Sequence, residues 1–589
     1  MYRILFVLLV TICISGCYLK KKLSKSNPPN IVIIMTDDQG WGDLSINGNL
    51  DIQTPNIDKL ALEGVRFKNF YVSPVCSPTR AEFLTGRYHI RTGVYSTTEG
   101  GERINLDEKT IADVFKEAGY TTAAYGKWHN GMQYPYHPNG RGFDDFYGFC
   151  SGHWGNYFNP VLEHNGKIIR GNGFIIDDLT KYGINFIEKN KNKPFLLYLP
   201  YNTPHSPMQV PDKWYKKYKH KDITQKGTNL AKENIPFTKA ALAMCENIDW
   251  NVGRIQSKIK ELGIDDNTII VYLSDNGPNN WRWNDGMKGI KSSTDEGGVR
   301  SPLFIKWKGK IDKGLQIETI AGAIDLLPTL ADLASIDLKV DKPLDGISLK
   351  NTIFNKKNNK ARSRSIFNYW KGRLSVRNQK FRLSNNGQLF DIENDREQKN
   401  NVSNKFLEVK EKLSQAAIHF REIAEAELPI NDSRTFPLGH PDFKYTHIPA
   451  RDGVAYGNIK RSNKFPNCSF FTNWISVEDE IIWNIEVVES GNFKVTLYYT
   501  CPEGDEGASF KLTQGNNVLK AQILEPHDPP LEGMEKDRVK RENSYVKDFK
   551  PLNIGEIYLE KGISKLTLKA LEIPGNSVMD IRLLMFERK

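Results

Sequence analysis

The chain has 589 residues, more than one hydrophobic core usually serves, so we expect two or more domains. Hydrophobic residues make up 39% and aromatic residues 11% of the sequence, which excludes a disordered protein. The formal net charge of +11 is spread over small Lys/Arg clusters. No nucleic-acid recognition motif accompanies this charge, so we expect another kind of anionic partner.

The N-terminal residues have the pattern of a secretory leader. A positive start at Met1-Tyr2-Arg3 is followed by an apolar run from Ile4 to Ile14, which is too short to span a bilayer. The closing Ile14-Ser15-Gly16-Cys17 resembles a bacterial lipobox, which implies cleavage before Cys17 and lipidation of its thiol. A plain signal peptide with an incidental cysteine is the alternative. We therefore expect a signal peptide over residues 1–16 and a polar tether over residues 17–29. The protein would be a bacterial lipoprotein, held at the periplasmic face or the cell surface by its lipid anchor alone.

From residue 30 to about residue 300, short β-branched runs alternate with amphipathic segments, which predicts an α/β fold with a mixed, largely parallel sheet flanked by helices. Three apolar runs, 31–35, 195–199 and 268–273, are of the buried-strand type. Residues 238–262 carry apolar residues at helical spacing.

Each of the three predicted strands ends in a polar cluster: Asp37-Asp38, Asn202 to His205, and Ser274-Asp275-Asn276. Since sites in open α/β sheets form at the carboxyl ends of strands, we expect these clusters to converge. Asp37, Asp38, Asp275 and Asn276 offer four oxygen donors without a thiolate or a histidine. This set predicts a hard cation, Ca²⁺ or alternatively Mg²⁺, in preference to zinc.

The C-terminal half changes character twice. Residues of about 336 to 438 are expected to form a small α+β subdomain with a helix from Lys405 to Ala426. Over residues 439–589, alternating stretches such as Phe493 to Tyr499 predict an all-β, jelly-roll-like sandwich. Whether this module binds glycan or only packs on the rest is open. The sequence also leaves open whether a disulfide between Cys468 and Cys501 joins two strands of this module.

One motif connects these expectations to chemistry. Cys76-Ser77-Pro78-Thr79-Arg80, followed by Leu84-Thr85-Gly86-Arg87, reads Cys-x-Pro-[Ser/Thr]-Arg and then Leu-Thr-Gly. Alone, it favours an ordinary turn and helix with a buried free cysteine. Together with Gly126-Lys127-Trp128-His129 and Glu296-Gly297-Gly298-Val299-Arg300, it resembles the signature of type I, formylglycine-dependent sulfatases of the alkaline phosphatase superfamily, of the arylsulfatase-like bacterial polysaccharide type.

The resemblance implies an alkaline-phosphatase-like catalytic domain over residues 30–335. It also implies a formylglycine-generating or sulfatase-maturating enzyme that oxidises Cys76 to formylglycine. One hydroxyl of the hydrated aldehyde would attack sulfur, and the other would expel sulfate by re-forming C=O. The modified Cys76 would join the four oxygen donors as a metal ligand.

The same resemblance assigns roles to basic residues. His129 would be the base that takes the hydroxyl proton, and Arg80 and Lys127 would stabilise the alkoxide. His205 and Lys291 would bind the ester sulfate, and either can protonate the leaving alcohol, Lys291 if neighbouring cations lower its pKa. Lys288 competes with Lys291 for this position, and the family spacing favours Lys291.

The predicted reaction is hydrolysis of a sulfate ester on a sulfated poly- or oligosaccharide, algal (such as ulvan) or alternatively a glycosaminoglycan. A formylglycine-dependent phosphodiesterase or phosphonate hydrolase is the rival reading, and an inactive glycan-binding lipoprotein is a remote one. Aromatic faces stack on sugar rings and arginine grips carboxylates. The candidate sugar contacts on this basis are His153, Trp154, Trp281, Arg282, Trp283, Trp370 and Arg373.

Overall fold

The computed structural model describes residues 27–354, 363–428 and 432–589. The predicted signal peptide, most of the tether and the predicted lipidation site Cys17 therefore lie outside the described residues. Within the described ranges, no helix is both long and apolar enough to cross a membrane.

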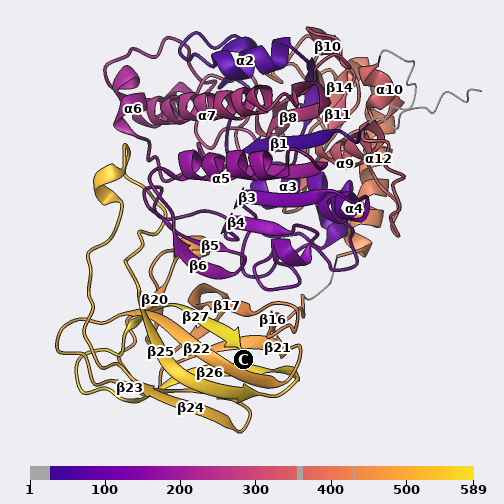
Figure 1. The fold of residues 1–589 in the computed structure, drawn as a ribbon. Helices are drawn as coiled ribbons and strands as arrows, with labels where there is room; N and C mark the ends of the chain where they lie inside the picture. The colour runs from indigo at the N-terminus through magenta and orange to yellow at the C-terminus, as the bar shows by residue number, and fades with distance from the viewer. Residues whose placement is uncertain (1–26, 355–362, 429–431) are drawn as a thin grey trace, which may run out of the picture.

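An eleven-stranded sheet organises the first 330 residues (Figure 1). Its central strands run parallel in the order β8 (Thr268–Ser274), β1 (Asn30–Thr36), β7 (Phe195–Pro200), β3 (Thr121–Lys127) and β4 (Asp145–Phe149). The outer strands are partly antiparallel: β9 (Arg300–Trp307), β2 (Val65–Tyr71), β10 (Leu315–Ile317), β11 (Ala321–Gly322), β5 (Val161–His164) and β6 (Lys167–Arg170). The sheet is thus mixed and parallel at its centre, as predicted.

The apolar run of β1 is continuous because both faces of the strand are covered. Ile31, Ile33 and Met35 enter one core, with side chains of α3 (Cys76–Thr85), α4 (Ile111–Glu117) and α9 (Leu326–Leu333). Val32 and Ile34 enter the opposite core, with α2 (Pro55–Leu62), α5 (Ile175–Asn190) and α7 (Ile235–Glu261). A strand buried on both faces has no polar face to alternate with.

The long helix α7 begins three residues before its predicted start at Thr238. The Asn234 side chain caps it by accepting a hydrogen bond from the Phe237 backbone N–H at 3.0 Å, and Pro236 lies in the first turn. Both are ordinary helix-start features.

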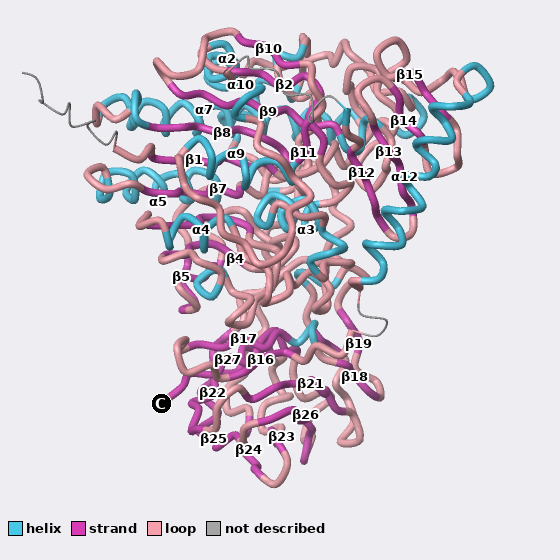
Figure 2. The backbone as a smooth tube through the Cα atoms, turned by 90° about the vertical axis from the view of Figure 1, so that its right-hand side faces the viewer, coloured by secondary structure: helices cyan, strands magenta, loops and turns pink. Residues whose placement is uncertain are grey.

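The predicted small subdomain is an antiparallel sheet with one helix beside it (Figure 2). Its strands are β12 (Ile366–Trp370), β13 (Arg373–Arg377), β14 (Phe381–Leu383) and β15 (Leu389–Asp391). The helix α12 (Leu407–Ala426) starts two residues later than predicted, after a short 3₁₀ turn over Ser403–Lys405. Leu413 and Phe420 of α12 pack against this sheet.

The C-terminal part consists of two sheets that share one apolar core. The first contains β16 (Phe436–Leu438), β18 (Val454–Tyr456), β21 (Glu480–Val487), β23 (Ser509–Gln514), β24 (Asn517–Gln522) and β26 (Gly562–Glu572). The second contains β17 (Tyr445–Pro449), β19 (Lys460–Arg461), β20 (Phe471–Thr472), β22 (Gly491–Thr500), β25 (Lys550–Leu559) and β27 (Asp580–Arg588). Cys468 and Cys501 are both free, so the possible disulfide between them is absent. The predicted fold class is confirmed.

The sandwich packs directly on the catalytic domain. Figure 1 shows it below β5 and β6, with a long yellow connection between β24 and β25 that extends upward. In that connection the Gly533 carbonyl accepts a hydrogen bond from Gln209 Nε2 at 2.8 Å, and Arg538 Nη2 donates to the Val210 carbonyl at 2.7 Å. Of the two readings the sequence left open, these contacts support packing.

Candidate active site

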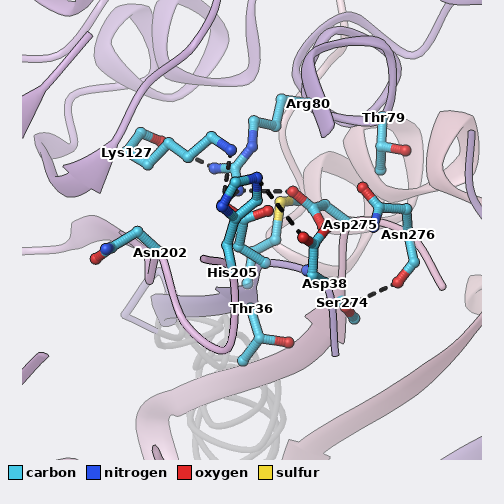
Figure 3. A network of polar contacts seen from close by, with 12 residues as sticks. Thr36, Asp38, Thr79, Arg80, Lys127, Asn202, His205, Ser274, Asp275 and Asn276 are labelled. Atoms are coloured by element: carbon cyan, nitrogen blue, oxygen red, sulfur yellow. Dashed lines mark hydrogen bonds and ion pairs between the residues drawn. The ribbon is translucent and has the colours of Figure 1, made fainter. Parts of the chain in front are cut away.

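The three polar clusters converge at the carboxyl edge of the central strands, as Figure 3 shows. Because β1 lies between β7 and β8, the residues that follow these strands meet around Asp37 and Asp38. The Asp37 backbone N–H bonds to the Thr203 carbonyl at 3.2 Å, and the Asp275 N–H bonds to the Thr36 carbonyl at 3.0 Å. Backbone hydrogen bonds therefore connect the ends of the three strands independently of any side chain.

The helix α3 brings the cysteine motif to this edge. Cys76 is its first residue and Arg80 follows one turn later, so both side chains lie on one face of the helix. Arg80 is fully buried and its Nη2 lies 2.8 Å from Asp275 Oδ2. Ligand atoms of Asp37, Cys76 and Asp275 lie within 4.8 Å of one another.

Cations neutralise part of the acidic cluster. Lys127 Nζ lies 2.6 Å from Asp37 Oδ2, and Lys291 Nζ lies 2.6 Å from Asp38 Oδ1. Burial raises the pKa of Asp37, but Lys127 and the other nearby cations outweigh it and hold that pKa well below its usual range. Burial, together with the charge of Asp37, raises the pKa of Asp275. Three cations, Arg80, Lys127 and Lys291, thus face the three carboxylates, and burial is the largest cause that disfavours a charged Asp275.

Three buried oxygens of the predicted ligand set have no hydrogen-bond partner: Asp37 Oδ1, Asp38 Oδ2 and Asn276 Oδ1. Leaving buried polar atoms unpaired costs free energy unless another group binds them. An all-oxygen donor set with buried, unpartnered oxygens fits a hard divalent cation. The residues present are therefore consistent with the predicted metal site.

His129 is held in one tautomer by the backbone. Its Nε2 lies 2.8 Å from the Thr97 carbonyl, which can only accept, so the ring proton is on Nε2. Its Nδ1 is buried and has no partner. Burial and the charge of Lys127 lower the pKa of His129 well below its usual value, so the ring is neutral. A neutral imidazole with a free nitrogen can accept a proton.

The structure separates the two competing lysines. Lys291 reaches Asp38, whereas Lys288 is partly exposed and lies 4.0 Å from Asp295, away from the cluster. Burial would lower the pKa of Lys291, but Asp38 and the other anionic groups outweigh burial and raise it. The condition for proton donation by Lys291, a pKa lowered by neighbouring cations, is therefore not met: with Asp38 adjacent, the ammonium keeps its proton.

Two further histidines lie beside this lysine. His205 Nε2 is 3.6 Å from Asp38 Oδ2, and burial followed by the charge of Lys291 lowers the pKa of His205. The His153 ring stacks on the His205 ring, with centroids 5.9 Å apart. Of the candidate sugar contacts, His153 is thus the one placed directly against the cluster.

Two other candidates are structural. Arg282 is 3% exposed and binds Asp43 with both Nε, at 2.8 Å, and Nη2, at 2.6 Å. Its Nη2 also donates to the Asp38 carbonyl at 2.9 Å, so it holds the metal-site loop and is unavailable to a sugar. Trp370 is 5% exposed and packs near His89, so its face cannot stack on a sugar ring. Both predictions are wrong because burial is not visible in a local motif.

The remaining candidates keep some exposure. Arg373 at the start of β13 is exposed, while Trp281 and Trp283 are half-buried, and Trp283 packs over Gly42. Trp154 is half-buried and stacks on Phe149. Within the described part of the chain, no hydrogen bond or ring contact joins these four side chains to the acidic cluster.

Sequence reasoning missed Thr97 and Asn467, which adjoin His129 from a surface loop and from the sandwich. Neither belongs to a recognisable motif, and Asn467 is 338 residues away along the chain from His129. No signal in the sequence points to them.

Comparison with known proteins places this geometry in context. A family model described as "Sulfatase" matches residues 29–336, and one described as "N-sulphoglucosamine sulphohydrolase, C-terminal" matches residues 281–422. The chain is 34% identical over 381 residues to an uncharacterized sulfatase, YdeN, of Escherichia coli (strain K12), covering 55% of this chain and 66% of that protein. It is 32% identical over 362 residues to the N-acetylgalactosamine-6-sulfatase of Mus musculus, with the same coverages. The chain thus spans just under two thirds of the length of these relatives.

Among solved structures, Ps i-CgsB in complex with k-i-k-neocarrahexaose superimposes with a TM-score of 0.60 at 33% identity. That match covers 68% of this chain and 93% of the other. The matched family models end at residue 422, before the sandwich begins at β16.

Proposed function

The chain belongs to the sulfatase family, whose model matches just over half of it, and from this we propose that the protein is a sulfuric ester hydrolase acting on sulfated carbohydrate. The reaction is R–O–SO₃⁻ plus water giving R–OH plus sulfate. The observation that carries the proposal is the convergence of Cys76 with a buried acidic cluster that has three unpartnered oxygens and two lysines.

We propose that Cys76 is converted to formylglycine by a maturating enzyme. When formed, this group supplies a hydrated aldehyde, whose two hydroxyls serve first to attack sulfur and then to release sulfate. The environment of the unmodified residue supports the proposal, because burial raises the pKa of the Cys76 thiol. A protonated thiol is a poor nucleophile, so the plain cysteine would have little catalytic use.

A hard divalent cation would be held by Asp37, Asp38, Asp275 and Asn276 together with residue 76. We favour Ca²⁺ over Mg²⁺. When bound, the cation supplies positive charge to the sulfate oxygens and restrains the nucleophile.

The chain's own groups divide the remaining work. His129 Nδ1 is free to accept the hydroxyl proton of residue 76. Arg80 and Lys127 place two further positive charges beside that residue and Asp37. Lys291 remains charged and, with His205, would bind the ester sulfate. Because the pKa of Lys291 is raised, a role in binding charge suits it better than proton donation.

Two observations bear on the substrate class. A structural neighbour at 33% identity was solved with a carrageenan oligosaccharide, and a relative at 32% identity is named for N-acetylgalactosamine 6-sulfate. We propose a sulfated algal oligosaccharide, with carrageenan now ahead of ulvan, and glycosaminoglycans as the second class.

Sulfate release from purified oligosaccharides of carrageenan, ulvan and glycosaminoglycans, with a phosphonate monoester and a phosphodiester in parallel, tests the proposal. We expect sulfate from at least one algal oligosaccharide. Hydrolysis of only the phosphonate or phosphodiester would replace the proposal by that rival activity. Binding of the sugars without any release would favour the inactive glycan-binding reading.

We also propose that the protein is exported and anchored through lipidated Cys17, at the periplasmic face or the cell surface. Mass spectrometry of the mature N-terminus checks this directly. A diacylglycerol-modified Cys17 is expected, and an unmodified N-terminus beyond residue 17 would contradict it.

A further inference from the structure

The segment Ser151 to His153 lies between the sandwich and the catalytic histidines. On the catalytic side, its backbone passes against His129: a Cβ added to Gly152 would lie 2.5 Å from His129 Nε2. One residue later, the His153 ring stacks on His205 at 5.9 Å between centroids. The Gly152 backbone therefore leaves little free space beside the His129 ring.

The sandwich holds this segment through three residues. Asn467 Oδ1 accepts a hydrogen bond from the Gly152 N–H at 3.1 Å, and Cys468 Sγ donates to the His153 carbonyl at 2.9 Å. Arg451 Nη1 donates to Ser151 Oγ and to the Asn467 carbonyl. Both Arg451 and Cys468 are buried, so these contacts are shielded from water.

Asn467 makes a second contact that concerns His129 directly. Its Nδ2 donates to the Thr97 carbonyl at 3.3 Å, and this is the carbonyl that accepts the His129 Nε2 proton at 2.8 Å. The orientation of the Asn467 amide is determined by its partners, since the Gly152 N–H must face an acceptor and the Thr97 carbonyl must face a donor. The Asn467 side chain thus holds both the Thr97 carbonyl, which accepts from His129 Nε2, and the Gly152 backbone, which lies beside the His129 ring.

We propose that Asn467, a residue of the C-terminal sandwich, is a positioning residue for His129, and that the sandwich is for this reason a required part of the active site. The proposal rests on the proposed function, because it takes His129 as the base. By donating to the Thr97 carbonyl, Asn467 keeps the proton of His129 on Nε2 and leaves His129 Nδ1 free toward residue 76. Through Gly152 it limits the space available to the ring.

Steady-state kinetics of Asn467→Ala and Asn467→Asp provide the first test. Loss of the partner of a functional side chain typically lowers activity by about tenfold or more. We expect a fall of about tenfold in kcat for both variants with KM unchanged, because the substrate-binding residues stay in place. The Asp variant keeps an acceptor for Gly152 but places a second acceptor against the Thr97 carbonyl, so it should not restore activity.

Arg170→Ala is the matched control. It breaks a different contact between the same two modules, the Arg170–Asp548 ion pair at 2.6 Å, whose side chains are about half exposed. We expect its kinetics to match those of the wild type. An equal fall in this variant would mean that any loss of docking lowers activity, which would overturn the specific role of Asn467.

The second test does not depend on turnover. In protein labelled with ¹⁵N-histidine, with the His129 signals assigned by their loss in His129→Gln, the wild type should show a single tautomer with the proton on Nε2. Asn467→Ala and Asn467→Asp should show averaging between the tautomers. Unchanged His129 signals in both variants, with wild-type kcat, would overturn the proposal. If the wild type released no sulfate from any ester, the proposed function would fail, while the tautomer comparison would still decide the positioning role.

Discussion

Two of the buried clusters of charged side chains in the catalytic domain differ in whether all their oxygens have a partner. At the strand ends, Asp37, Asp38 and Asp275 meet Arg80, Lys127 and Lys291, and oxygens of the ligand set remain unpartnered. Behind them, Glu296 is equally buried, but each of its oxygens has a partner: Tyr71 at 2.7 Å, Arg300 at 3.3 Å and Arg382 at 3.0 Å. The carboxyl groups of both clusters are fully buried, so burial alone does not distinguish them.

One carboxyl of the strand-end cluster, Asp275, has its pKa shifted in the opposite direction to that of Glu296, whereas the pKa of Asp37 is lowered like that of Glu296. Burial and the charge of Asp37 raise the pKa of Asp275, whereas around Glu296 the arginines, Arg382 foremost, outweigh burial and lower its pKa to about 2. A cluster whose buried polar atoms all have hydrogen-bond partners within the protein stabilises the fold. One that leaves buried oxygens without a hydrogen-bond partner is suited to bind another group. We therefore assign the chemistry to the cluster at the strand ends and a role in stabilising the fold to the cluster around Glu296.

Loss of Cys76 should have the largest effect on the catalytic cluster. Cys76→Ser and Cys76→Ala should abolish turnover without unfolding the protein, because serine can attack sulfur but cannot regenerate an aldehyde. Cys501→Ser, at a buried cysteine of the sandwich, is the control and should remain active. Peptide mass spectrometry should show formylglycine at position 76 in active enzyme. Active material carrying only cysteine there would remove the mechanism.

Asp275→Ala should lower activity by orders of magnitude and abolish stoichiometric metal binding, measured together by kinetics and elemental analysis. The variant loses a proposed ligand and also the partner of Arg80. Asp285→Ala is the matched control, since Asp285 lies outside the cluster in an ion pair with Arg396 and is partly exposed. Full wild-type activity after exhaustive chelation, with no metal detected, would contradict a functional metal site.

Lys291→Ala should lower kcat and kcat/KM together by roughly 10²–10³, or about 3–4 kcal/mol, which is typical of losing one charge-stabilising contact in a transition state. Lys288→Ala should change either quantity far less, because Lys288 lies by Asp295 and is partly exposed. The opposite ranking would assign the role in chemistry to Lys288 and contradict the role proposed for Lys291.

Glu296→Gln should leave turnover per folded molecule nearly unchanged and act on stability instead. The folded-state pKa of about 2 is below the ordinary value of 4.5, so the charged carboxylate stabilises the fold above pH 4.5 and this contribution is lost as the pH falls toward 2. The shift corresponds to about 3 kcal/mol. Denaturant unfolding at neutral and acidic pH should show this deficit in the variant at neutral pH and a smaller difference near pH 2. A selective loss of kcat with unchanged stability would break the comparison.

Much of the strand-end cluster was predictable. Asp37, Asp38, Asp275 and Asn276 follow apolar runs whose length and composition mark buried strands, and parallel neighbours bring their carboxyl ends to one edge. The preference for Lys291 over Lys288 came from motif spacing, and the geometry agrees with it. Arg282 and Trp370 were misassigned because aromatic and arginine side chains look the same in sequence whether they face a substrate or the core.

The sequence by itself determined the three buried strands, the polar residues that follow them and the cysteine motif, because these depend on local patterns along the chain. Only the tertiary structure decided which buried oxygens lack a partner, that Arg282 supports the Asp38 loop, and that Asn467 lies behind His129. Such contacts join residues hundreds of positions apart. They depend on how the sandwich docks on the catalytic domain, and no periodicity within either segment encodes that docking.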